Sequence, residues 1–391
     1  MNESSTLQNK GRFGTIALIV GIAGLALSAA GYVFDAGRFF FSWHVAFAYW
    51  VTLALGALFF TLLQHVTGAV WSIVVRRVSE AMSTTLPWLA LFFIPVLLGA
   101  GTLFHWSHAD VMASDAVLAR KAGYLNLGFF AVRGVLYFAI WTALAWLLNR
   151  HSLAQDASGD PARTLSLRKI SAGGMFFFAF SITFAAFDWL MSLDPHWYST
   201  IFGVYVFVGG FLVSMAFMTL FLLHLKGRGI LADTVTIEHY HDLGRLLFAF
   251  SVFWAYIGGS QYFLIWYANI PEETSWFLAR WDADSWRMLS LCLIAFHFAV
   301  PFLVLVFHAA KRNLTVLRSI AALLMVMHYV DMYWLVMPTM SAESVQPSWM
   351  DATTVFGIGG IVVWLFYRRF ASHPIVPKGD PRLQDSIAHR V

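Results

Sequence analysis

The stretch HDLGRLLFAFSVFWAYIGGSQYFLIWYANIPEET, residues 241–274, decides the fold of this chain. Its first 25 or so residues are almost wholly apolar, which exceeds the ~20 residues that a helix needs to cross a bilayer. The stretch therefore predicts a membrane span. Inside it, Trp254, Tyr256, Gln261 and Tyr262 carry hydrogen-bonding groups, and unsatisfied polar groups in hydrocarbon cost several kcal/mol. We expect neighbouring helices to pack against this span on several sides.

The composition extends this prediction to the whole chain. Of the 391 residues, 59% are apolar, 17% aromatic and only 12% charged, whereas soluble domains carry about 25% charged residues. This predicts an all-α, polytopic membrane protein. The pI of about 9.2 is explained by cationic loops that face anionic lipid and cytoplasm, and it indicates no nucleic-acid partner.

Apolar runs of spanning length predict ten helices with short connections. The predicted spans are 13–34, 41–65, 86–104, 124–149, 170–192, 199–225, 243–268, 286–310, 314–338 and 350–370. No connection is long enough for an independent soluble domain. We therefore expect the chemistry to lie in the membrane or at its faces.

The distribution of lysine and arginine predicts the orientation. Most of these residues fall on the side of the N-terminus, so both termini are expected in the cytoplasm. On that side, residues 68–85 read as an amphipathic surface helix and residues 156–169 as a flexible linker. The polar tail, residues 373–391, is expected to be ordered only where a partner holds it.

A carboxylate among aromatic residues recurs four spans apart. Asp188 lies near the end of the fifth span and Asp331 near the end of the ninth. This echo predicts two four-helix bundles, residues 41–192 and 199–338. The spans 13–34 and 350–370 would flank them.

An ionisable side chain inside a span costs at least ~2.5 to 3.5 kcal/mol, so each one demands a reason. His328 and Asp331 stand three residues apart on one helical face. A histidine and a carboxylate within hydrogen-bond reach can hold and pass a proton near neutral pH. The alternative is a buried pair that only locks helix packing.

The same two readings apply to other buried polar residues. Asp188 is either a proton-path carboxylate or an interhelical anchor. His297 precedes Pro301 by four residues, so its carbonyl lacks a helical amide partner and a hydrated pocket could form there. Gln261 is counted with this predicted proton path. Arg133 requires a carboxylate, from Asp188 or Asp115, or else a quinone headgroup or lipid phosphate.

Histidines near the helix ends have further readings. His105 and His108, three residues apart, could contact a quinone or simply lie at the interface, and no spacing typical of a metal site accompanies them. The remaining candidates at cytoplasmic helix ends form either solvated caps or a proton entry funnel, and they are His65, His224, His241 and His308, with Gln64 and Asp242.

No redox centre is expected on this chain. Cys292 is its one cysteine, which excludes a disulfide, a four-cysteine iron–sulfur site and a CxxCH haem attachment. No paired histidine spacing indicates a haem b. We expect no metal or cofactor bound by this chain alone.

Two long phrases resemble a known family. FDWLMSLDPHWYSTIFGVYVF, residues 187–207, and LLFAFSVFWAYIGGSQYFLIWYANIPEETSWF, residues 246–277, are similar to the second NrfD-like, polysulfide-reductase-type membrane subunits (ActF) of bacterial alternative complex III. The ten predicted spans and short loops fit that family over essentially the whole chain. Gly258 and Gly259 depart from it, because bulkier or hydroxylated residues are expected there.

The resemblance implies a place in the bacterial inner membrane. It implies a complex that oxidises membrane quinol and passes electrons through iron–sulfur and c-type haem subunits to a cytochrome c or a terminal oxidase. Partners would be a paralogous NrfD-like subunit holding the quinol site, the iron–sulfur and cytochrome subunits, and membrane lipids. Asp188, His328 and Asp331 are the residues carried over for testing.

The sequence therefore predicts a subunit without a redox cofactor that contributes a proton path coupled to quinol oxidation. It would be either non-catalytic or proton-translocating. Two alternatives stay open. One is a quinone pocket in the first bundle formed with Arg133, His105 and Asp188, and the other is a scaffold for the paralogous subunit.

Overall fold

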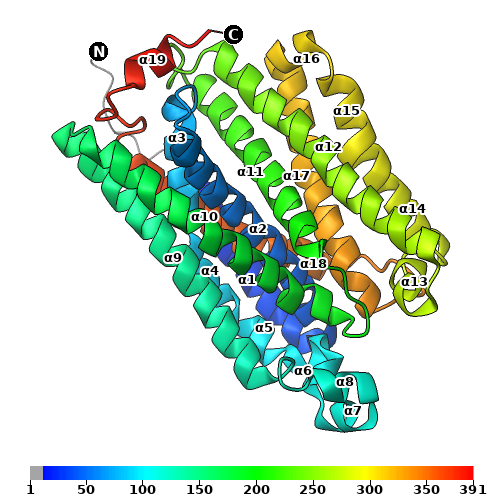
Figure 1. Cartoon of the computed structure of the whole chain (residues 1–391). Helices are drawn as coiled ribbons and strands as arrows, with labels where there is room; N and C mark the ends of the chain where they lie inside the picture. The colour runs from blue at the N-terminus through cyan, green and yellow to red at the C-terminus, as the bar shows by residue number, and fades with distance from the viewer. Residues whose placement is uncertain (1–11, 391) are drawn as a thin grey trace.

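The computed structural model describes residues 12–390, which are helical and contain no strand. Ten helical stretches in this range are long and apolar enough to cross a membrane, which confirms the predicted all-α, multi-pass architecture (Figure 1). These are α1 (Arg12–Phe34), α2 (Ala36–Thr67), α3 to α5 (Ile73–Leu98), α9 (Leu127–Ser158), α10 with η2 (Ala162–Leu193), α11 (Phe202–Lys226), α12 (Ile237–Ala268), α14 to α15 (Asp284–Leu305), α17 with η4 (Leu314–Thr339) and α18 (Trp349–Ala371).

Several of these stretches are segmented, and short helices join them. The third comprises α3 (Ile73–Ser83), α4 (Leu86–Phe92) and α5 (Ile94–Leu98), and the eighth comprises α14 (Asp284–Cys292), the π-helix η3 (Leu293–Ala299) and α15 (Val300–Leu305). The remaining elements are α6 (Ala100–Leu103), η1 (His105–Ser107), α7 (Ala109–Ser114), α8 (Ala116–Lys121), η2 (Met191–Leu193), α13 (Pro271–Leu278), α16 (His308–Arg312), η4 (Met337–Thr339) and α19 (Leu383–Ile387).

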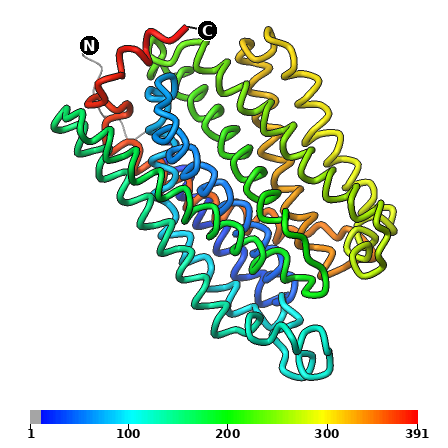
Figure 2. The backbone as a smooth tube through the Cα atoms, in the orientation of Figure 1, coloured from blue at the N-terminus to red at the C-terminus, as the bar shows by residue number. Residues whose placement is uncertain are grey.

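Two helices form the centre of the molecule. In the most apolar windows of α2 and α11, 94% and 89% of the residues are buried, whereas in most other spans half of the residues or fewer are buried. The two helices approach closely because Gly56 and Gly210 face each other, and a Cβ at Gly56 would lie only 2.2 Å from the Gly210 carbonyl oxygen. Around α2 pack α3 to α5, α9 and α10, and with α2 they are here called the first group. Helices α12 and α17 pack on α11, α14 to α15 cover α12 and α17, and these helices are called the second group (Figure 2).

The flanking helices α1 and α18 pair with each other along most of their length. Small residues allow this, because a Cβ at Gly24 would lie 2.6 Å from the Gly357 backbone and one at Gly360 would lie 2.3 Å from the Gly21 backbone. The pair is antiparallel, since Gly14 contacts Tyr367 and Gly31 contacts Met350. The start of α1, the end of α18 and α19 therefore share one end of the bundle, here called the tail end. The other end is called the opposite end.

The expected surface helix at 68–85 is corrected by the structure. Helix α3 forms there, but all of its residues are buried. Its charges are satisfied internally: Arg76 and Arg77 both bond Glu80, at 2.9 and 2.5 Å, and Arg77 also bonds Asp156 of α9 at 2.6 Å. The polar face of this helix meets protein partners rather than lipid headgroups.

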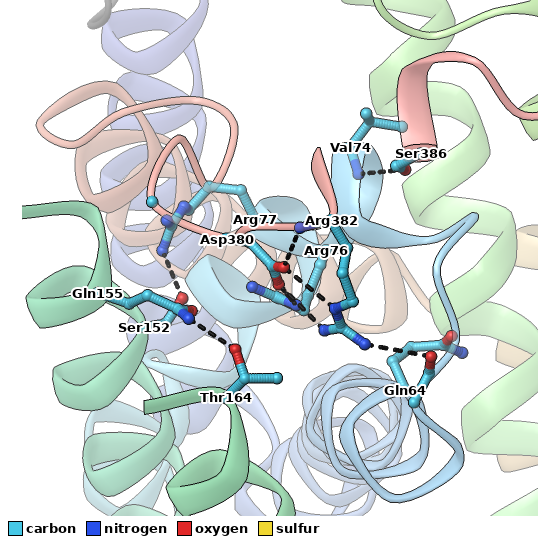
Figure 3. A network of polar contacts seen from close by, with 12 residues as sticks. Gln64, Val74, Arg76, Arg77, Ser152, Gln155, Thr164, Asp380, Arg382 and Ser386 are labelled. Atoms are coloured by element: carbon cyan, nitrogen blue, oxygen red, sulfur yellow. Dashed lines mark hydrogen bonds and ion pairs between the residues drawn. The ribbon is translucent and has the colours of Figure 1, made fainter. Parts of the chain in front are cut away.

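The expectations for the tail and for residues 156–169 are wrong. Helix α9 continues to Ser158 and α10 begins at Ala162, so the presumed linker is almost entirely helical. The tail is held by the chain itself, because Asp380 bonds Arg76 at 3.2 Å and Ser386 accepts from the Val74 amide at 3.4 Å (Figure 3). These buried partners lie more than 300 residues away in sequence, where no local pattern reports them.

Candidate functional site

Asp331 lies near the end of α17 in the second group of helices and is fully buried. The Tyr205 hydroxyl on α11 donates to its Oδ1 at 2.5 Å, and the Trp254 indole on α12 donates to its Oδ2 at 3.2 Å. Both donors are neutral, and no cation pairs with this carboxyl group among residues 12–390. Because no cation within that range compensates a negative charge here, this carboxyl group can be neutralised only by binding a proton.

Two histidines lie beside this acid. His328, one turn earlier on α17, bonds the Thr52 hydroxyl of α2 at 3.0 Å. The ring of His297 lies 4.2 Å from the ring of Trp254 and 6.4 Å from that of His328. His328 and Asp331 do not bond each other, because their hydrogen bonds go to different helices. The two residues do share one buried face of α17.

The local backbone explains how these groups fit together. His297 lies within the π-helix η3, just before Pro301, and a proline that removes one amide bond commonly accompanies such irregular turns. Gly209 of α11 makes room on the other side, since a Cβ there would lie 3.1 Å from the His328 ring and 3.7 Å from Asp331 Oδ2. Both nitrogens of His297 and Nδ1 of His328 lack a described protein partner.

A cavity of about 390 Å³ adjoins this cluster. Tyr205 and Trp254 form its inner wall, Gln261 and Arg280 line its polar part, and α12 contributes Gly258 and Gly259. The Ser199 hydroxyl donates to the side-chain oxygen of Gln261 at 3.1 Å, and Gln261 makes no hydrogen bond to Asp331, His297 or His328. Further wall residues are Phe202, Tyr262, Trp276, Phe277, Leu293, Ile294, Phe298 and Trp334.

Arg280 closes the cavity toward the opposite end. Its guanidinium donates to the carbonyls of Trp276, Trp334 and Leu335 and stacks on the Trp276 ring at 3.5 Å. Burial lowers the pKa of the Arg280 guanidinium to about 9, and the charge of Asp194 opposes that effect. The same side chain lines a second cavity of about 310 Å³ at the opposite end, so it separates the two spaces.

The first group of helices holds a different acid site. Asp188 on α10 accepts from Arg133 Nε at 2.7 Å and from its Nη2 at 2.9 Å, and the Tyr137 hydroxyl adds a bond of 2.7 Å. Arg133 Nη1 donates to the carbonyl oxygen of Tyr124. The Tyr124 ring also lies over the Arg133 guanidinium at 3.8 Å. The structure thus selects Asp188 rather than Asp115 as the partner of Arg133.

The predicted quinone contacts of the first bundle are not assembled into one site. His105 and His108 are exposed, and His108 bonds the Gly101 carbonyl at 2.7 Å. His105 lines the second cavity with Asp194 and His196 instead of contacting Arg133. Nearby, the hydrogen bond from His196 lowers the pKa of Asp115.

The tail-end histidines gather only in part. The rings of His241 and His308 lie 4.5 Å apart, and Asp242 bonds His389 of the tail at 2.8 Å. His65 is buried elsewhere beside Arg76, and the ring of His224 lies tilted against that of Phe13 at 5.0 Å. No group of three or more histidine, cysteine, aspartate or glutamate side chains in the described part of the chain could hold a metal ion.

Sequence reasoning missed the tyrosines and Arg280. Tyr205 and Tyr137 are aromatic residues in long apolar helices, where an interfacial or packing role is the default. Only the carboxylates opposite them reveal their role as donors. Arg280, between two short helices, resembles an ordinary loop cation until its burial is known.

Comparison with known proteins adds no constraint, because no family model and no curated protein matches this chain.

Proposed function

We propose that this multi-pass membrane protein is a subunit, without a redox cofactor of its own, of a bacterial quinol-oxidising complex of the alternative complex III kind. In this proposal its second group of helices passes protons while neighbouring subunits carry the electrons. The termini would lie in the cytoplasm and the tail end would take up the protons. The resemblance of residues 187–207 and 246–277 to the NrfD-like subunits of that complex motivates the assignment.

One observation carries the proton role: Asp331 is buried against neutral donors only. An ion held in an apolar interior without a counter-ion is costly, so a carboxyl group placed this way is suited to gaining and losing a proton. His328 and His297 lie beside it, and their unpartnered ring nitrogens are groups that water would satisfy.

Further buried polar groups lie on the tail-end side of this cluster. Ser251 precedes Trp254 by about one turn on α12, and Ser214 follows Gly209 by somewhat more than a turn on α11. Both are fully buried, and neither hydroxyl has a described partner. Beyond them on α12 lie His241 and Asp242. We infer that a proton enters there, passes these serines and the histidines, and reaches Asp331.

The path would leave through the 390 Å³ cavity. Tyr205 and Trp254 connect Asp331 to its wall, and Gln261 lies two turns beyond Trp254 on the same helix. Arg280 then separates this cavity from the one at the opposite end. Asp188 plays no part in this route, since Arg133 compensates its charge.

The test uses the complex purified with its native neighbours and reconstituted in vesicles. Asp331→Asn should lower the number of protons moved per electron and leave the Michaelis constant for quinol unchanged. Asp351→Asn is the matched control, because this buried carboxylate is paired with Arg38 at 2.5 Å and lies outside the route. An unchanged proton ratio in Asp331→Asn would contradict the proton path and favour the scaffold.

A quinone pocket is the second candidate function. The cavity against α12 is a better place for it than the first bundle. Its volume of about 390 Å³ falls in the ~300–1,000 Å³ range of small-molecule sites, whereas Arg133 and Asp188 are engaged with each other. Gly259→Leu should raise the Michaelis constant for quinol if a quinone binds there. An unchanged constant would remove this candidate.

A further inference from the structure

A third cavity, of about 580 Å³, lies near the tail end where α4, α9 and α18 meet. Its polar lining includes Arg368 and Arg369 at the end of α18, Ser372 just beyond, and Asn149 of α9. Its apolar lining includes Trp88 and Trp146. This cavity belongs to neither acid site and plays no part in the proposed proton route.

The two arginines lack anionic partners. Arg369 donates to the amide oxygen of Asn149, and Arg368 lies over the Trp364 ring at 5.6 Å. No carboxylate lies within 4.0 Å of either guanidinium among residues 12–390. By contrast, Arg76 and Arg77 nearby are each paired with acids. The cavity therefore contains two adjacent positive charges that have no counter-ion in the described part of the chain.

The cavity lies at the level along the helices where lipid headgroups are expected. Trp88 and Trp146 are 50% and 54% exposed on the outer surface of the bundle, and half-exposed tryptophans mark the membrane–water interface. Arg150 stacks over Trp146 at 5.0 Å. Helix α18 ends at Ala371, within the same layer. The cationic part thus lies where phosphates of a bilayer lie, and the apolar part extends toward the acyl chains.

We propose that this cavity binds an anionic phospholipid of the leaflet at the tail end. Arginine pairs with phosphate through charge-assisted, often bidentate hydrogen bonds, and basic pockets between membrane helices on one face are typical of such lipids. The phosphate lies against Arg368 and Arg369, with Ser372 and Asn149 as polar neighbours. The acyl chains run along Trp88, Trp146 and Leu365. The bound lipid joins α18 to α4 and α9.

Native mass spectrometry of the full chain, washed in mild detergent, tests this site. The chain is offered equal amounts of phosphatidylglycerol and phosphatidylcholine with the same acyl chains. Retention of phosphatidylglycerol should exceed that of phosphatidylcholine by about tenfold. In the double variant Arg368→Gln/Arg369→Gln this preference should disappear. Equal retention of both lipids by the unmodified chain would overturn the proposal.

A matched control removes two positive charges elsewhere. Arg168→Gln/Lys169→Gln changes two exposed residues near the same end of α10, outside the cavity, and should keep the preference. If this control loses it equally, attraction is general and the site does not exist. Arg368 is exposed, so Arg368→Gln alone tests the site without a folding penalty, and Arg368→Lys should retain part of the preference.

A further arm separates a lipid from a free anion. Excess inorganic phosphate should leave the bound phosphatidylglycerol in place, because the tryptophan-lined part of the cavity contributes apolar burial that phosphate lacks. Full displacement by phosphate would overturn the lipid assignment.

Discussion

Asp188 and Asp331 hold similar positions but have different surroundings. Each lies near the end of the last helix of its group, each is buried, and each accepts a hydrogen bond from a tyrosine hydroxyl. Asp188 also accepts two hydrogen bonds from Arg133, whereas the one further hydrogen bond to Asp331 comes from the Trp254 indole. The comparison teaches that the nature of the partner, rather than burial itself, separates a buried acid that anchors helices from one that can exchange a proton.

The largest expected effect comes from removing the compensating charge at Asp188. Arg133→Gln should lower the free energy of unfolding by about 3–5 kcal/mol, because it leaves a buried carboxylate without its ion partner. Thermal unfolding in detergent, followed by circular dichroism, measures the loss. Asp331→Asn serves as the comparison. Equal losses in the two variants would show that the two sites do not differ as proposed.

A smaller difference is expected between the two tyrosines. Tyr205→Phe should cost about 1–3 kcal/mol, because Asp331 loses one of its two donors inside the bundle. Tyr137→Phe should cost less, since Arg133 still bonds both oxygens of Asp188. The same unfolding measurement ranks them, and the reverse order would contradict the role assigned to Tyr205.

Asp331→Asn should cost about 1 kcal/mol or less, because the amide keeps the shape, its oxygen can accept from the Trp254 indole, and its NH2 group can donate to the Tyr205 oxygen. It should nevertheless abolish a pH-dependent carboxyl signal. Infrared difference spectra recorded across a pH step should contain a carboxylic acid band in the unmodified chain and in Arg38→Lys, and lose it in Asp331→Asn. A band that persists in Asp331→Asn belongs to another acid.

The smallest effect concerns Asp380, another buried acid, which lies outside the membrane spans. Burial alone would raise the pKa of Asp380, but the hydrogen bond from Arg382 and the charge of Arg76 hold it below its usual value. A lowered folded-state pKa stabilises the docked tail fully above the unfolded pKa of ~3.9, and this contribution is lost as the pH falls through the folded value.

Protease cleavage of residues 373–390 should therefore be slow and unchanged from pH 5 to 8 and should accelerate below about pH 4. Asp380→Asn should remove that acid dependence and make cleavage faster at neutral pH. Cleavage that accelerates already between pH 7 and 5 would indicate that a histidine, such as His389 on Asp242, controls the tail instead.

Part of the site follows from local sequence. The three-residue spacing of His328 and Asp331 places them on one face of α17, and Pro301 indicates an irregular turn at His297. Their partners do not follow. Tyr205 is 126 residues from Asp331 and Thr52 is 276 residues from His328, and no helical period connects positions that far apart.

The sequence by itself determined the class of this protein and its ten spans, because the bilayer requires about 20 apolar residues for each crossing whatever the helices pack against. It also selected the acids and histidines that demand explanation, because each is costly in hydrocarbon. Only the tertiary structure decided which acid meets an arginine and which meets neutral donors. It alone docked the tail on α3 and formed the cavities, since hydrogen bonds and empty space depend on helices brought together from distant parts of the chain.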